Sequence, residues 1–157
     1  CYRQTYRMHG STPYLNLEFF LRVGCAMPQN LLLVIAERGG RPVAASFNVH
    51  NGRRMFGRYW GAIEHHPGLH FETCYYRTIE YCITHGIDVF EGGSRGEHKL
   101  ARGLAPVETL SAHWLAHSQF AAAVEEFLAR EVKGVAHYID ELNDRSPFKE
   151  AGEQDAK

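Results

Sequence analysis

The stretch EGGSRGEHKLARG at residues 91–103 holds the densest set of residue types that can bind an anion. Glycines allow close backbone approach and positive φ, and cationic side chains stabilise negative charge, most strongly where it forms in a dry site. The set comprises Gly92, Gly93, Arg95, Gly96, His98, Lys99 and Arg102. If 97–102 forms a helical turn, Arg95, Lys99 and Arg102 lie on one side at i, i+4 and i+7. The loop therefore fits a phosphate, a carboxylate or a developing oxyanion, and the alternative is a solvated basic turn paired with Glu91 and Glu97.

A second group of candidate residues lies in EHHPGLHFE at 64–72, which contains His65, His66, His70 and Glu72. The zinc motif HExxH is absent, and a Pro-Gly pair separates the first two histidines from the third, so we predict no metal site. His70 and Glu72 fall in the first turn of an expected helix at the sheet edge, where α/β sheets bind ligands. One of them is a candidate for a pocket.

Two phosphate-binding signatures are missing from the sequence. There is no GxxxxGK[ST] and no GxGxxG. Cys74 and Cys82 lie eight residues apart on one amphipathic stretch, and the interpretation is that they are small buried hydrophobic residues. These absences leave the glycine-rich loop as the main candidate for chemistry.

The charge balance excludes a protein that holds nucleic acid by bulk charge. The 157 residues carry 17 Lys and Arg against 18 Asp and Glu, a net charge of -1. Residues 1–68 carry +5 and residues 69–157 carry -6, and Lys99 is the first lysine of the chain. The longest apolar run, LLLVIA, has the length of a strand, so we expect no membrane span. Four cysteines without CxxC spacing favour a reduced, cytoplasmic location.

Periodicity and turn residues predict the elements that position these side chains. A helix is expected after Asn16 and before Pro28. Three antiparallel strands are expected to follow, with turns at Gly39-Gly40 and Asn51-Gly52 that take positive φ at both central residues. A helix over 69–85, capped by Gly86, is expected to bury Phe71, Tyr75, Ile79, Cys82 and Ile83.

The sequence of the second half of the chain predicts two further strands and a long C-terminal helix. The run at 87–91 is expected to lie parallel to the strand at 53–60, because a helix connects them. Residues 107–115 predict a further strand, and 120–142 predict a long helix with a break at Gly134. The fold class is α/β (α+β), a mixed, mostly antiparallel sheet flanked by helices, in one domain over residues 1–145 with a polar tail at 146–157.

The order of elements resembles the acyltransferase fold of the Gcn5-related superfamily, and within it the sequence resembles the FemAB-like group of peptidoglycan biosynthesis proteins and predicted N-acyltransferases. The resemblance covers essentially the whole chain. It rests on GRYWG at 57–61, LHFETCYYRTIEYCITHG at 69–86, FEGGSRGEHKLARGLAPVETLSAHW at 90–114 and LNDRSPFK at 142–149. Members of this group look roughly twice as long, and the chain begins with Cys1. The expectation is that it is similar to a C-terminal half whose N-terminal domain, a partner in the same polypeptide, is missing.

The resemblance implies an acyl donor and a lysine near the transferred group. FemAB-like proteins take an aminoacyl group from charged transfer RNA and carry Gly-Gly followed by Phe-Lys-x-x-Phe-Gly. The matching residues are Gly92, Gly93, Lys99 and Gly103, with His98 in place of the aromatic and Arg102 before the glycine. Relatives that use acyl-CoA carry R/Q-x-x-G-x-G/A before the crossover helix, whereas this chain has GAIEHHPGLHF, which argues against that mode of CoA binding.

The resulting hypothesis is an N-acyltransferase that moves an acyl or aminoacyl group to an amine, possible donors being acyl-CoA and aminoacyl-tRNA. Lys99 would stabilise the oxyanion or leaving group, and Arg95 and Arg102 would bind donor phosphate or an acceptor carboxylate. The proton acceptor is His98, Glu72 or His70. Tyr59 and Trp60 would wall the acyl slot.

A hypothesis from another class is a non-catalytic module that binds an anionic cell-wall precursor through the same loop. A third is that the isolated half is inactive without its partner domain. The identity of the amine acceptor, a small molecule or a precursor, and the oligomeric state stay open.

Overall fold

Two structural units make up the chain in the computed structural model, Cys1–Arg95 (unit 1) and Gly96–Lys157 (unit 2). The structure describes residues 1–93 and 97–147, and each unit is described by itself. The expected single domain over residues 1–145 stays a prediction.

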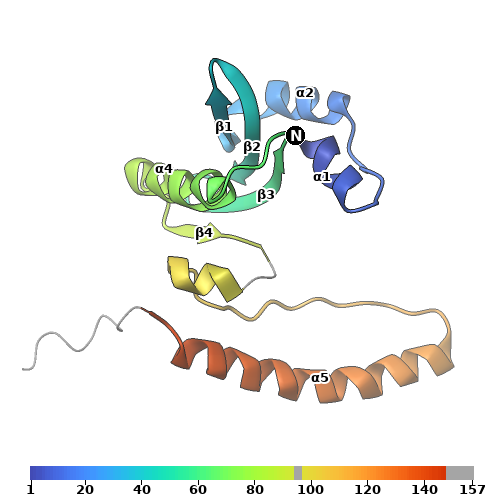
Figure 1. Ribbon diagram of the computed structural model, residues 1–157. Helices are drawn as coiled ribbons and strands as arrows, with labels where there is room; N and C mark the ends of the chain where they lie inside the picture. The colour runs from blue at the N-terminus through green and yellow to red at the C-terminus, as the bar shows by residue number, and fades with distance from the viewer. Residues whose placement is uncertain (94–96, 148–157) are drawn as a thin grey trace, which may run out of the picture. The chain divides into compact units, whose positions relative to one another are not determined.

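A four-stranded mixed sheet forms the centre of unit 1 (Figure 1). Its strands, in spatial order, are β1 (Leu31–Arg38), β2 (Arg41–His50), β3 (Arg54–Ala62) and β4 (Val89–Glu91). β1, β2 and β3 are antiparallel, and β4 runs parallel to β3. The sheet and its flanking helices confirm the predicted α+β class and the predicted crossover connection.

The two hairpin turns have different geometries. Gly39 and Gly40 have φ of 59° and 75°, as the Gly-Gly pair predicts. At the second turn the expectation of positive φ at both central residues is wrong, because Gly52 has φ of 87° but Asn51 does not have a positive φ. Instead, the Asn51 side chain accepts hydrogen bonds from the backbone N–H groups of Arg53 and Arg54, at 3.1 and 2.8 Å. The turn is therefore built on an asparagine side chain in place of a second left-handed residue.

Helices cover both faces of the sheet in unit 1 (Figure 1). On one side, α1 (Tyr2–Met8) and α2 (Leu17–Ala26) pack on the sheet through rings such as Tyr2, Phe20 and Phe47. On the other side runs the crossover helix. Its segments are α3 (Leu69–Phe71), the π-helical η2 (Glu72–Tyr76) and α4 (Arg77–His85).

The hydrophobic core lies between the crossover helix and the sheet. Met55, Cys82 and Ile87 are buried, and three partly buried hydrophobic residues pack against them. These are Leu32, Tyr81 and Phe90. Burial also raises the pKa of the Cys74 thiol to about 11, so this cysteine is a protonated side chain at neutral pH.

The two N-terminal helices differ in how well the sequence predicts them. The Asn16 side chain accepts a hydrogen bond from the Phe19 N–H at 2.9 Å, which confirms the N-cap of α2. α1 is absent from the prediction, because its seven residues bury no side chain fully and its start has no side-chain cap. The short 3-10 helix η1 (Pro28–Asn30) then leads into β1.

The crossover helix confirms its predicted span and its cap at Gly86, which has φ of 65°, but not its whole buried face. Ile83 is 77% exposed, whereas Thr78 is fully buried. The physical reason is the π segment η2, because its extra residue per turn rotates the later residues relative to a regular α-helix.

Unit 2 contains two helices and a long connection. They are the 3-10 helix η3 (Glu97–Arg102) and α5 (Ser118–Asp144). The predicted strand over 107–115 is wrong, since the structure shows no regular element there and Leu110 and Trp114 are 89% and 85% exposed. A strand needs a partner for its backbone groups, and none of the described strands pairs with this segment. The predicted break at Gly134 is also wrong, because α5 continues through it.

In the part of the chain that the structure describes, no helix is both long enough and apolar enough to span a bilayer. Most of the predicted tail at 146–157 lies outside the described residues.

The N-terminal backbone leaves no room for a side chain at Gly61, which gives a testable prediction. A Cβ there would lie 2.4 Å from the carbonyl carbon and oxygen of Cys1 and 2.9 Å from the nitrogen of Tyr2. Gly61→Ala is expected to displace α1 and lower the free energy of unfolding by about 1–3 kcal/mol, measured by urea denaturation. Backbone amides of α1 should also exchange hydrogen faster.

Gly57→Ala is the matched control, because a Cβ at Gly57 meets its nearest atoms at an ordinary 3.6 Å. Its free energy of unfolding should be unchanged or raised by up to about 1 kcal/mol. Equal effects of the two substitutions would contradict the steric explanation.

Candidate functional site

A buried polar network fixes the crossover helix on the sheet. Ser46 Oγ, on β2, donates a hydrogen bond of 2.9 Å to the backbone oxygen of Thr73, inside the π segment. The Thr78 hydroxyl donates to the same oxygen at 3.4 Å, and Asn48 Nδ2 donates to Ser46 Oγ at 3.2 Å. All four residues are buried. A π turn leaves backbone groups out of the regular helical ladder, so these side chains satisfy a carbonyl that would otherwise be costly to bury.

This attachment brings two predicted site residues together, His70 at the start of the helix and Trp60 near the end of β3. Their ring centroids are 5.2 Å apart, with the planes at 68°. Tyr75 completes the group, since its ring centroid lies 5.5 Å from that of His70. His70 and Trp60 are both half-buried. They form a small aromatic surface at the carboxyl end of β3.

Tyr59 and Trp60 are neighbours on β3, and both residues line a pocket between α1 and β3. Successive side chains of a strand point to opposite faces, so the two rings have different neighbours. The Tyr59 ring packs against Tyr2 at 5.1 Å and Phe47 at 6.3 Å, and its hydroxyl shares a hydrogen bond of 2.7 Å with the hydroxyl of Tyr14. The expectation that Tyr59 and Trp60 wall an acyl slot stays a prediction.

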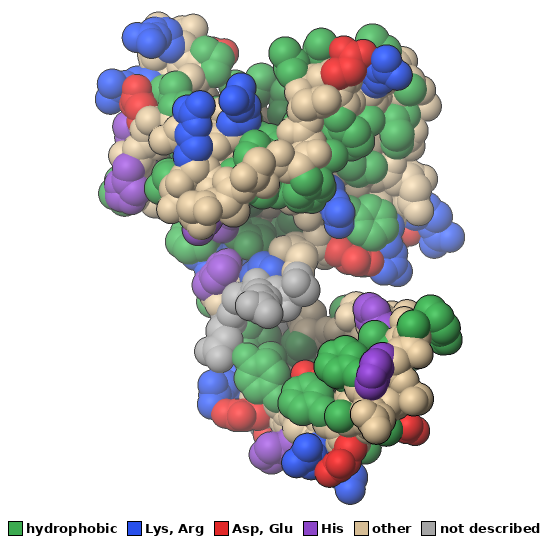
Figure 2. All heavy atoms as spheres, turned by 90° about the vertical axis from the view of Figure 1, so that its right-hand side faces the viewer, with side chains coloured by type: hydrophobic (Ala, Val, Ile, Leu, Met, Phe, Trp, Pro, Cys, Tyr) green, Lys and Arg blue, Asp and Glu red, His purple; other side chains and the backbone are tan. Residues whose placement is uncertain are grey.

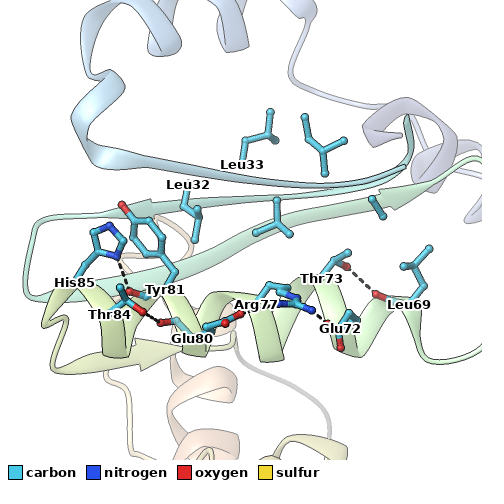
Figure 3. Close-up of a pocket in the computed structure, with 13 residues that line it drawn as sticks. Leu32, Leu33, Leu69, Glu72, Thr73, Arg77, Glu80, Tyr81, Thr84 and His85 are labelled. Atoms are coloured by element: carbon cyan, nitrogen blue, oxygen red, sulfur yellow. Dashed lines mark hydrogen bonds and ion pairs between the residues drawn. The ribbon is translucent and has the colours of Figure 1, made fainter. Parts of the chain in front are cut away.

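The Glu72 carboxylate is held by Arg77 on the crossover helix. The carboxylate accepts a hydrogen bond from Arg77 Nε at 2.8 Å, and Arg77 bonds Glu80 as well. These side chains line an open groove of about 560 Å³ between the helix and the edge strand β1, as Figure 3 shows. His70 does not line this groove. The two candidate bases of the helix therefore face different surroundings.

Gly92 and Gly93 follow β4 directly, next to the carboxyl end of the sheet in unit 1. An ion pair between Arg54 and Glu91 ties the end of β4 to β3. Gly93 has φ of 88°, a conformation that side-chain-bearing residues rarely adopt. This glycine therefore has a backbone role that its sequence context predicts. The predicted site residue Arg95 lies outside the described residues.

In unit 2, Lys99 and Arg102 lie on one side of η3, because residues three apart eclipse in a 3-10 helix. Partial burial lowers the pKa of Lys99. An Arg102 Nη1 group donates to the backbone oxygen of His98, and Gly103 ends the turn with φ of 82°. The helical turn expected over 97–102 is confirmed, and it presents two cationic side chains together.

Two polar contacts converge on Glu64 in the histidine-rich segment before the crossover helix. His66 Nε2 lies 3.0 Å from Glu64, and Arg38 lies 3.3 Å from the same carboxylate. Among the described residues, no group of three or more side chains could hold a metal ion.

Sequence reasoning missed the polar network and the double pairing of Arg77. Ser46 and Asn48 alternate on β2, which is the pattern of one strand face, but polar residues at such positions ordinarily indicate solvent. Their burial depends on long-range partners, because Ser46 donates to the Thr73 oxygen in the π segment and Asn48 Nδ2 donates to the Leu32 oxygen on β1.

Ser46→Ala tests the network. It removes a donor to the Thr73 oxygen and an acceptor for Asn48, so the free energy of unfolding should fall by about 1–3 kcal/mol in urea denaturation. Thr84→Ala is the control, because its exposed hydroxyl bonds only the Glu80 oxygen within the same helix. Its effect should stay within about 0.5 kcal/mol, and an equal loss for both variants would contradict the role given to Ser46.

Comparison with known proteins identifies a family for this chain. No curated protein matches the chain. A family model described as FemAB-like, peptidoglycan biosynthesis/recognition, matches residues 1–150, which is nearly all of the sequence and includes both β3 and η3. The chain therefore belongs to the FemAB-like family, whose role is in peptidoglycan biosynthesis or recognition.

Proposed function

We propose that this protein is an N-acyltransferase that transfers an acyl or aminoacyl group to the amine of a peptidoglycan-precursor-type acceptor. Family membership supports the substrate class. The observation that carries the proposal is the pair of cationic side chains, Lys99 and Arg102, on one side of the turn that ends at Gly103. A cationic turn of this kind suits the negative charge that develops in acyl transfer.

The proposed reaction follows from the charges that form during aminolysis. The acceptor amine attacks the carbonyl carbon of a thioester or ester, which forms a C–N bond and places negative charge on the carbonyl oxygen. The Lys99 ammonium stabilises this oxyanion, and Arg102 binds a donor phosphate or an acceptor carboxylate. The intermediate collapses as the bond to the leaving oxygen or sulfur breaks, and the amine proton passes to a base.

His70 is the base that we favour over Glu72, and His98 stays an alternative. Its ring is half-buried against Trp60, whereas the carboxylate of Glu72 is bonded by Arg77 and faces the groove at β1. Trp60 would then contact the acceptor, and Gly92 and Gly93 would allow its close approach to the backbone. The donor is an aminoacyl-tRNA or an acyl-CoA, and both belong in the assay.

Lys99→Ala is expected to lower kcat for acyl transfer by about 100-fold or more, with little change in melting temperature, because an oxyanion partner acts only in the transition state. Lys99→Arg should retain part of the activity. Lys133→Ala, on exposed α5, is the matched control and should behave like the unchanged protein. The assay follows acylation of an amine acceptor from each donor. Saturable donor binding without turnover in the unchanged protein would instead favour the non-catalytic module.

The pH dependence gives a separate test of Lys99. Its ammonium form is required, and burial lowers its pKa, so activity should fall as pH rises through a value below that of an ordinary lysine. In Lys99→Arg this alkaline loss should shift to higher pH, because the guanidinium stays charged. An unchanged alkaline limb would show that another group titrates.

A pair of substitutions distinguishes the candidate bases. His70→Gln should lower kcat, since the imidazole is proposed to accept the amine proton. Glu72→Gln should change kcat little. Kinetics of the two variants and of His98→Gln across pH measure this, and a loss confined to Glu72→Gln or His98→Gln would assign the base to that residue.

A further inference from the structure

A pocket of about 350 Å³ lies between α1 and β3, on the face of the sheet opposite to the crossover helix. Its volume falls in the range of small-ligand sites, roughly 300–1,000 Å³. The residues that carry the argument are Tyr2, Tyr6, His9, Ser11, Arg58 and Tyr59. We propose that this pocket binds a small anion that carries a ring, with its phosphate or carboxylate on Arg58 and its ring against the tyrosines. The proposal does not depend on acyl transfer.

Arg58 reaches the pocket because β3 has an extra residue there. Tyr59 pairs with Phe47 and Gly57 pairs with Asn48, so Arg58 is left without a partner on β2. A β-bulge of this kind re-aims the side chain of the extra residue. Arg58 is exposed and forms no ion pair with any residue in the described part of the chain. Its guanidinium is thus available to a ligand.

The wall opposite β3 is held in place by direct bonds. Thr5 Oγ1 donates to the backbone oxygen of Trp60 at 2.9 Å, and the backbone of Cys1 and Tyr2 lies against Gly61. The rings of Tyr2 and Tyr6 have centroids 4.9 Å apart. These contacts build a preformed concave site from helix and strand, which favours binding because little order must be gained.

The charges around the pocket favour an anion over a cation. No residue that lines it is acidic, and the first acidic residue of the chain, Glu18, is paired with Arg22. Arg3 and Arg7 lie on α1 beside the lining tyrosines. Figure 2 views the molecule from the side where Figure 1 shows α1, and blue cationic side chains stand among the hydrophobic ones there. An aromatic cage for ammonium groups would lack its usual attraction here, because Arg58 repels a cation.

The tyrosine hydroxyls can donate hydrogen bonds to an anion. Burial and the hydrogen bond with Tyr14 raise the pKa of Tyr59 to about 12, and the hydrogen bond with Tyr2 raises the pKa of Tyr6. These phenols therefore stay protonated at physiological pH, and a phenolate would otherwise repel the ligand.

Isothermal titration calorimetry with phenyl phosphate and with benzoate tests the proposal on the unchanged protein. Saturable binding of at least one is expected, weakening as salt rises. Arg58→Gln should lower its affinity about tenfold or more, and Arg58→Lys should restore part of it. Arg41→Gln is the matched control, because Arg41 is exposed and does not line the pocket, and it should bind like the unchanged protein.

Several outcomes would overturn the inference. Equal affinity for inorganic phosphate would show that the ring contributes nothing, and tighter binding of benzylamine would identify a cation site. An equal loss in Arg58→Gln and Arg41→Gln would show diffuse charge attraction without a site. Binding of phenyl phosphate alone would indicate a phosphate site, and binding of benzoate alone would indicate a carboxylate site. Binding of both would show that the pocket accepts either group. Acyl transfer is measured in parallel, so a failure of either proposal is separately visible.

Discussion

The hydrogen bond from Ser46 to the Thr73 oxygen is the contact on which the arrangement of unit 1 depends. It joins the central pair of strands to the one part of the crossover helix that is not a regular α-helix. Because the network around it is buried, the helix cannot slide or rotate without leaving polar groups unsatisfied. That fixed position sets which side chains of the helix meet the sheet, including the contact of His70 with Trp60.

Two single-residue insertions shape the candidate surfaces of this fold. The π segment adds a residue to the helix, and the bulge at Arg58 adds one to β3. Each insertion costs some regular hydrogen bonding, and each is offset by nearby contacts, in the helix by Ser46 and in the strand by the packing of Tyr59. Both devices change the direction of side chains without a change of topology. The consequence is a sheet with separate aromatic surfaces on its two faces.

Local patterns predicted much of this structure and long-range contacts decided the rest. Turns and helix caps depend on a few neighbouring residues, so the local sequence is enough to predict them. Examples are the Gly39-Gly40 turn, the Asn16 cap and the left-handed Gly86. The candidate turn at 97–103 was also found from glycine and charge spacing. The strand predicted over 107–115 does not form, because an alternating sequence becomes a strand only where a neighbouring strand pairs with it. Similarly, the π segment and the bulge depend on tertiary packing, so the hydrophobic periodicity of the sequence does not predict them.

The outer edge of β1 carries a consequence for the behaviour of the protein in solution. Within the described part of the chain β1 pairs on one side only, and Leu33 and Ile35 are 54% and 48% exposed. Charged residues occur only at its last two positions, Glu37 and Arg38, so little along its length discourages pairing with another extended chain. Unprotected edges of this type template intermolecular sheets. Concentrated samples, and chains that are only partly folded, therefore carry an aggregation risk at this strand.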